Sequence, residues 1–200
     1  MAIEPADGAQ HYDLFTRDGA TRLVWRLTDR GVALEPGAFI VRRSGQWTRA
    51  EFKRILSVTL SSGQAPGSRA IASCTIQMSS GLRIVVSNLN ARGVSDGSRD
   101  GIYRQFVADL HARLRDAGVA SGVAFRSGFS QARSTGLLVA GLIATGFFVV
   151  LPVILLLATH ELKALLITAA GLGLVVPIWR TFSANQPGSY NPRLPPDLLR

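Results

Sequence analysis

The chain has 200 residues, a formal net charge of +9 and 47% hydrophobic residues. This length suits one domain with additional segments, and the single cysteine, Cys74, excludes an intramolecular disulfide and a cysteine metal cluster. Residues 1–135 hold 18 of the 22 Lys and Arg residues, whereas residues 136–200 are mostly apolar. The composition therefore indicates a charged domain followed by an apolar segment.

The first 19 residues carry Glu4 and Asp7 and lack the apolar run of a signal peptide, so we expect an uncleaved N-terminal extension. A domain is expected over residues 20–118. Within it, short runs of alternating apolar and polar residues are separated by Gly, Pro and Ser turn signals. This alternation predicts about seven antiparallel strands, over residues 22–28, 32–35, 38–43, 46–49, 55–60, 71–78 and 82–87.

One amphipathic helix is expected after these strands, over residues 102–117. Its apolar residues recur at helical spacing and define a single face. The face consists of Tyr103, Phe106, Val107, Leu110 and Leu114.

Two uncharged runs follow a Gly- and Ser-rich linker, which we expect at a membrane surface over residues 119–135. The first run, residues 136–158, makes about 34 Å of helix, enough to cross a hydrocarbon core of about 30 Å. The second covers residues 164–179. These runs predict a two-helix transmembrane hairpin over residues 136–180. Arginines next to its outer ends place both termini in the cytoplasm.

A stripe of small residues, Gly136, Ala140 and Ala144, lies along the first of these helices. Such stripes allow close helix approach. The stripe favours packing against the second helix or association with another copy of the chain, which would make a homo-oligomer.

The C-terminal tail, residues 181–200, contains four prolines. A spacer without regular structure has this composition. Four apolar residues instead favour docking, either on the protein's own domain or on a partner. They are Tyr190, Leu194, Leu198 and Leu199.

The order of strands and helix resembles the bacterial pleckstrin-homology-like (PH-like) domains. Their opening hairpin is similar to residues 22–34, RLVWRLTDRGVAL. A strand that follows it is similar to residues 52–60, FKRILSVTL, and a later hairpin is similar to residues 75–86, TIQMSSGLRIVV. The segment 102–117 matches their closing helix. The resemblance implies an α+β fold in which an antiparallel PH-like β-barrel is capped by a C-terminal helix. The transmembrane hairpin would follow this barrel.

One segment matches a catalytic motif, because residues 93–97 read G-x-S-x-G around Ser95. Asp109 and His111 follow in the required order. They lie two residues apart on one expected helix, so their side chains point about 200° apart and cannot form a relay. The three histidines are scattered. We therefore expect a non-enzymatic protein with no catalytic residue, no metal and no cofactor.

The resemblance also implies a basic surface around the first hairpins, suited to anionic lipid headgroups or a protein partner. Its residues are Arg30, Arg42, Arg43, Arg49, Lys53 and Arg54. Nucleic acid is not expected, since no aromatic residues are interleaved along a basic groove. The leading hypothesis is a bacterial inner-membrane protein that binds a protein partner or anionic lipid at the cytoplasmic face. The alternative is an accessory subunit or assembly factor of a larger membrane complex.

Overall fold

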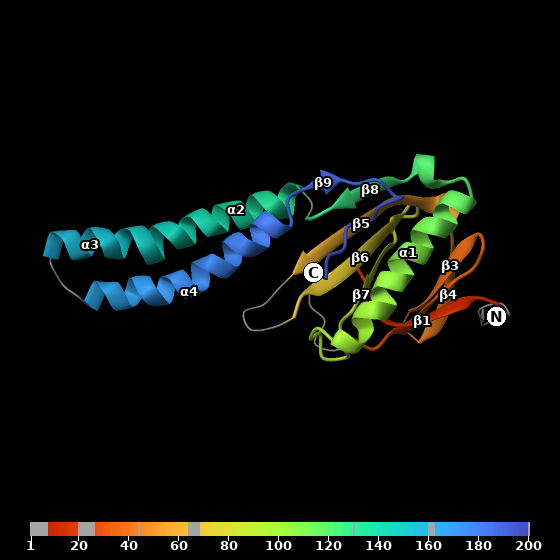
Figure 1. Ribbon diagram of the computed structural model, residues 1–200, viewed down its shortest axis with the longest axis horizontal. Coiled ribbons are helices and arrows are strands. Elements are labelled where there is room, and N and C mark those ends of the chain that lie inside the picture. Colours follow the sequence, from red (N-terminus) through yellow and green to blue (C-terminus); the bar gives the residue numbers. More distant parts are fainter. Residues whose placement is uncertain are drawn as a thin grey trace.

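The computed structural model describes residues 8–19, 27–43, 45–63, 69–129, 131–159 and 163–199. This part of the chain consists of one sheet, a helix that lies across it, and a pair of long helices that project from one end (Figure 1). The strand expected over residues 22–28 falls largely outside the described residues.

The sheet has nine strands among the described residues, in the order β4-β3-β2-β1-β7-β6-β5-β8-β9. Neighbouring strands are antiparallel except β5 and β8, which are parallel. The strands are β1 (Gln10–Asp18), β2 (Arg30–Leu34), β3 (Ala38–Arg43), β4 (Gln46–Glu51), β5 (Ile55–Gly63), β6 (Ile71–Met78), β7 (Arg83–Ser87), β8 (Ala124–Ser127) and β9 (Gly188–Ser189).

The core lies between the sheet and helix α1 (Asp100–Asp116), which crosses one face of the sheet (Figure 1). The apolar face predicted for this helix is buried, with Phe106 and Leu110 fully enclosed. Alternate residues of β5 and β6, such as Leu60 and Ile76, meet it from the sheet. Because side chains alternate between the two faces of a strand, the intervening polar residues lie on the opposite face.

The expected closed PH-like barrel is wrong, because the sheet is open, with β4 and β9 at its edges. A short 3₁₀ turn, Phe52–Arg54, separates β4 from β5. The edge of β5 that closure would need is occupied by β8, and β9 extends the sheet beyond it.

Three strands come from segments in which sequence patterns indicated none. β1 lies in the expected N-terminal extension, β8 in the expected linker, and β9 in the tail. β8 and β9 have four and two residues, too few to show a reliable alternation. Their pairing with a preformed sheet edge supplies the hydrogen bonds that their own sequences do not signal.

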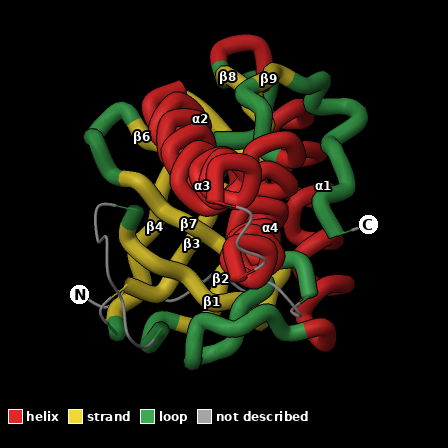
Figure 2. The backbone as a smooth tube through the Cα atoms, turned by 90° about the vertical axis from the view of Figure 1, so that its left-hand side faces the viewer, coloured by secondary structure: helices red, strands yellow, loops and turns green. Residues whose placement is uncertain are grey.

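The projecting pair consists of one continuous helix and a second helix packed alongside it (Figures 1 and 2). The first runs through α2 (Gln131–Thr145), a π-helical segment (Gly146–Val150) and α3 (Leu151–Thr159). The second is α4 (Lys163–Ala184). The two approach closely at Gly171, where an added Cβ would lie 2.5 Å from the Phe148 carbonyl oxygen.

The two-helix transmembrane hairpin expected over residues 136–180 is not shown. Among the described residues, one helical stretch, Ser134–Ala158, is long and apolar enough by length and composition to cross a membrane. In α4 the uncharged run covers only residues 164–179. That run is about 24 Å long as a helix, shorter than a hydrocarbon core of about 30 Å.

Candidate functional site

The basic residues predicted to form a binding surface are mostly paired with carboxylates. Four of the six form ion pairs, and Arg42 donates from Nε to the Gly45 carbonyl at 3.3 Å. Lys53 lies exposed in the turn after β4. Since a carboxylate neutralises each paired guanidinium, this surface is less positive than its composition indicates. The pairs are Arg30–Asp13, Arg43–Asp18, Arg49–Glu35 and Arg54–Glu51.

A second basic surface, which the sequence analysis missed, is a polar groove of about 540 Å³ beside the start of α2. We call it the hydroxyl groove. Its floor is the outer face of β5 and β6, where Ser and Thr alternate with buried apolar residues. The polar side chains of this floor are Ser57, Thr59, Ser61, Thr75 and Gln77.

Two arginines from β7 and β8, the strands on either side of this floor, also line the hydroxyl groove. Arg83 on β7 is paired with Gln77, and Arg126 on β8 is paired with Thr59. Arg83 lies in the row of Ser57 and Arg126 in the row of Thr59, so three strand spacings of about 4.8 Å and an offset of two residues put the two arginine backbones about 16 Å apart across the floor. The only sequence signal for this site was the period-two alternation of hydroxyl residues. The arginines come from strands whose pairing that signal does not reveal.

A set of backbone and amide hydrogen bonds fixes the long helices beside this groove. The buried Asn185 follows α4, and its Oδ1 accepts from the Ser62 N–H at 2.9 Å. Its Nδ2 donates to the Thr181 carbonyl at 3.0 Å, and its own carbonyl accepts from the Phe129 N–H at 3.0 Å. Through its side chain Asn185 therefore ties the end of α4 to β5, and through its main-chain carbonyl it ties it to the connection that enters α2.

The C-terminal tail lies on the protein's own domain in the structure. Tyr190, Leu198 and Leu199 pack against the core, whereas Leu194 is 79% exposed. Arg104 donates to the Leu199 carbonyl at 3.2 Å. Three of the four predicted docking residues therefore contact the domain, and Leu194 faces away from it.

A buried histidine holds the tail. His111 Nδ1 lies 2.6 Å from the Val107 carbonyl, and its Nε2 lies 2.8 Å from the Tyr190 hydroxyl. Because a carbonyl only accepts, Nδ1 carries the proton and Nε2 accepts from the hydroxyl. Burial lowers the pKa of His111 below its ordinary value of 6.5. The ring is therefore neutral at physiological pH.

Acidification is expected to destabilise the fold through His111. The unfolded chain binds the proton near pH 6.5 and the folded chain only at lower pH, so stability falls as pH drops below about 6.5, by at most about 1.4 kcal/mol per pH unit. Above that pH the histidine contributes no slope. Urea unfolding of the full chain in detergent at pH 7.5, 6.5 and 5.5 measures it. The variant His111→Gln should lack this part of the slope; an identical slope in both proteins contradicts the assignment.

Two of the three residues in the predicted small-residue stripe do not face α4. An added Cβ at Gly136 has nothing within 4 Å, and Ala140 is exposed. Ala144 is half-buried. The contact with α4 is made by the neighbouring Gly141, where an added Cβ would lie 3.6 Å from the Trp179 ring. Gly136 and Ala140 therefore point away from the helix pair.

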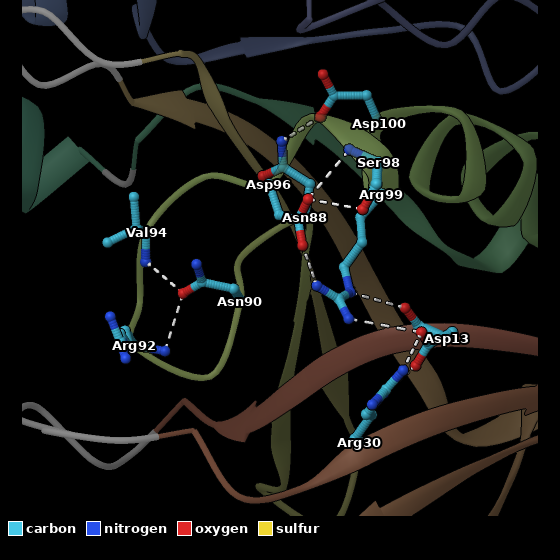
Figure 3. Close-up of polar contacts among 10 residues, drawn as sticks. All are labelled: Asp13, Arg30, Asn88, Asn90, Arg92, Val94, Asp96, Ser98, Arg99 and Asp100. Atoms are coloured by element: carbon cyan, nitrogen blue, oxygen red, sulfur yellow. Dashed lines mark hydrogen bonds and ion pairs between the residues drawn. The ribbon is translucent and has the colours of Figure 1, made fainter.

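The G-x-S-x-G segment belongs to a loop held by its own polar contacts (Figure 3). Asn90 Oδ1 accepts from the Val94 N–H at 3.2 Å, and Ser95 pairs with Leu89 in an isolated bridge. Arg99 Nε donates to the Asp13 carbonyl at 3.2 Å. These contacts fasten the loop between β1 and α1, and the buried His111 is engaged by the tail instead.

Cys74 lies in the core, and burial raises the pKa of its thiol to about 12. The thiol is therefore protonated at neutral pH and is a poor nucleophile. Within the described ranges, no group of three or more His, Cys, Asp or Glu side chains is placed to hold a metal ion.

Comparison of the chain with protein-family models and with curated proteins found no match in either set. The resemblance to PH-like domains stays a prediction.

Proposed function

We propose that the chain is a non-enzymatic protein of the bacterial inner membrane whose sheet domain binds anionic lipid or a protein partner at the cytoplasmic face. The observation that carries this proposal is the exposure of the helix Ser134–Ala158. Only 11% of its apolar window is buried by the described chain, and large side chains such as Ile143 and Leu157 are exposed. A helix of a soluble core has its apolar face covered, whereas a lipid bilayer removes this surface from water.

Charge next to the helix supports the cytoplasmic orientation. Arg126 and Arg133 precede the helix in the sequence. Short segments rich in Arg and Lys next to a membrane helix stay in the cytoplasm. The hydroxyl groove lies on the same side, because its floor and its two arginines come from strands that precede α2.

The chemistry of the nucleophilic side chains supports a binding role over an enzymatic one. The Cys74 thiol is buried and protonated, and both ring nitrogens of His111 are hydrogen-bonded inside the fold. Ser95 lies in the loop that fastens β1 to α1.

Hydrogen exchange of the full chain in lipid vesicles tests the lipid-binding part of this proposal. We expect amides of β5 and β8 to exchange more slowly in vesicles that mix phosphatidylcholine with phosphatidylglycerol than in phosphatidylcholine alone, because bound headgroups restrict opening of the sheet there. Helix α1, which packs on the core side of the sheet and does not line the groove, serves as the internal control. Equal exchange of β5 and β8 in both vesicles contradicts binding to anionic lipid.

A role as an accessory subunit or assembly factor is the second candidate, favoured by Gly136 and Ala140, which leave an open small-residue face on the helix. Such faces allow another helix to approach closely in a membrane. Purification in mild detergent followed by mass spectrometry distinguishes the candidates. A monomer with no accompanying protein counts against this second role.

A further inference from the structure

The two arginines of the hydroxyl groove differ from those of the predicted basic surface in their charge environment. Among the described residues, neither Arg83 nor Arg126 forms an ion pair, and none of the described residues that line the groove is acidic. Four arginines of the other surface are neutralised by carboxylates. The groove therefore carries two arginine charges that no carboxylate in its described lining neutralises.

The floor between the arginines offers hydrogen-bond donors in register. Thr75 is paired with Thr59 and Thr59 with Arg126, so two hydroxyls and a guanidinium lie in one row across the strands. Gln77 is paired with Arg83 in a second row, two residues further along β6 than Thr75. Hydroxyl and guanidinium groups together match the oxygens of a phosphate, which accepts several hydrogen bonds at once. A guanidinium also offers paired, parallel donors to two phosphate oxygens.

The position of the groove along the helix axis matches the headgroup layer of a bilayer. Gln131 at the start of α2 lines the groove, and the apolar stretch begins at Ser134. Three helical residues correspond to about 4.5 Å. The polar layer on each side of a bilayer is about 5–7 Å thick, so the end of the groove beside Gln131 lies at the depth of lipid phosphates when the helix spans the hydrocarbon core.

We infer that the hydroxyl groove binds the phosphate of an anionic phospholipid headgroup, with Arg83 and Arg126 supplying the charge and the hydroxyls of β5 and β6 supplying donors. This inference rests on the proposed membrane function, because the lipid belongs to the bilayer that holds the helix. The occupant is a lipid rather than an apolar peptide, since the floor of the groove is polar and the groove reaches Gln131 at the start of α2.

Native mass spectrometry of the full chain in mild detergent tests the inference, with phosphatidylglycerol and phosphatidylcholine as probes. The groove variant is Arg83→Gln/Arg126→Gln. The matched control is Arg92→Gln/Arg193→Gln, which removes the same charge from two exposed arginines outside the groove. We expect the groove variant to bind phosphatidylglycerol roughly 30-fold more weakly than the wild type, and the control to bind it normally.

A charge-retaining variant, Arg83→Lys/Arg126→Lys, keeps the test valid if the glutamine variant does not fold. It should recover part of the affinity, because lysine supplies charge without the paired donors. Wild-type affinity in a folded glutamine variant overturns the groove assignment. Displacement of the lipid by an equal concentration of glycerol 3-phosphate also overturns it, because the groove would then select a soluble phosphate.

The outcomes separate the two proposals. If the wild type binds both lipids equally, the lipid-binding part of the proposed function fails and the groove assignment fails with it. If the wild type prefers phosphatidylglycerol and the groove variant keeps that preference, the proposed function stands and only the groove assignment fails.

Discussion

Arginines placed at Ile143 and Phe147 are expected to release the protein from membranes. These side chains are 67% and 62% exposed, and they lie near the middle of the helix Ser134–Ala158. One arginine at the centre of a membrane helix costs about 3 kcal/mol on insertion scales, so the double variant Ile143→Arg/Phe147→Arg loses roughly 6 kcal/mol of insertion free energy. Immunodetection in membranes washed with alkaline carbonate measures the effect.

Leu194→Arg is the matched control, because Leu194 is the most exposed large apolar side chain of the tail and lies outside the helix. This variant is expected to stay in the washed membranes. Retention of the double variant at the wild-type level would show that the helix does not anchor the chain.

Gly128→Ala is expected to cause a large loss of stability at the junction between the sheet and the long helices. Gly128 has a φ of +80°, and an added Cβ would lie 2.3 Å from the Gln186 carbonyl and 2.6 Å from the Asn185 carbonyl. The left-handed backbone alone costs about 1–2 kcal/mol for a residue with a side chain. The overlap is with backbone rather than with a flexible side chain, so the connection must shift. The total loss should exceed about 3 kcal/mol.

Gly81→Ala separates the two contributions. Gly81 has a φ of +83° and nothing within 4 Å of an added Cβ, so only the backbone cost applies. Unfolding of both variants in detergent, followed by circular dichroism, compares their free energies of unfolding. An equal loss of unfolding free energy in the two variants would mean that the Asn185 and Gln186 carbonyls do not overlap with a side chain at position 128.

The features that were predictable from the sequence depend on neighbouring residues. Residues 72–78 alternate between apolar and polar side chains, and β6 covers Ile71–Met78. Residues 102–117 repeat at helical spacing, and α1 covers most of them. The apolar run from 136 is long enough to mark a candidate membrane helix without any partner. Side-chain period and run length are properties of one segment, so the sequence alone determines them.

Features that depend on partners far along the chain were decided by the tertiary structure. The sheet is open because β8 occupies the edge of β5, and no local pattern in four residues predicts that pairing. Arg49 forms an ion pair with Glu35, 14 residues away in the sequence. A count of arginines does not show this pairing and therefore overstates the positive charge of the predicted basic surface. Arg126 joins the hydroxyl groove only through its register with Thr59. Sequence periodicity determined which residues lie on the outer face of each strand, whereas strand order and register decided which of those residues meet, because pairing brings together segments that carry no local record of each other.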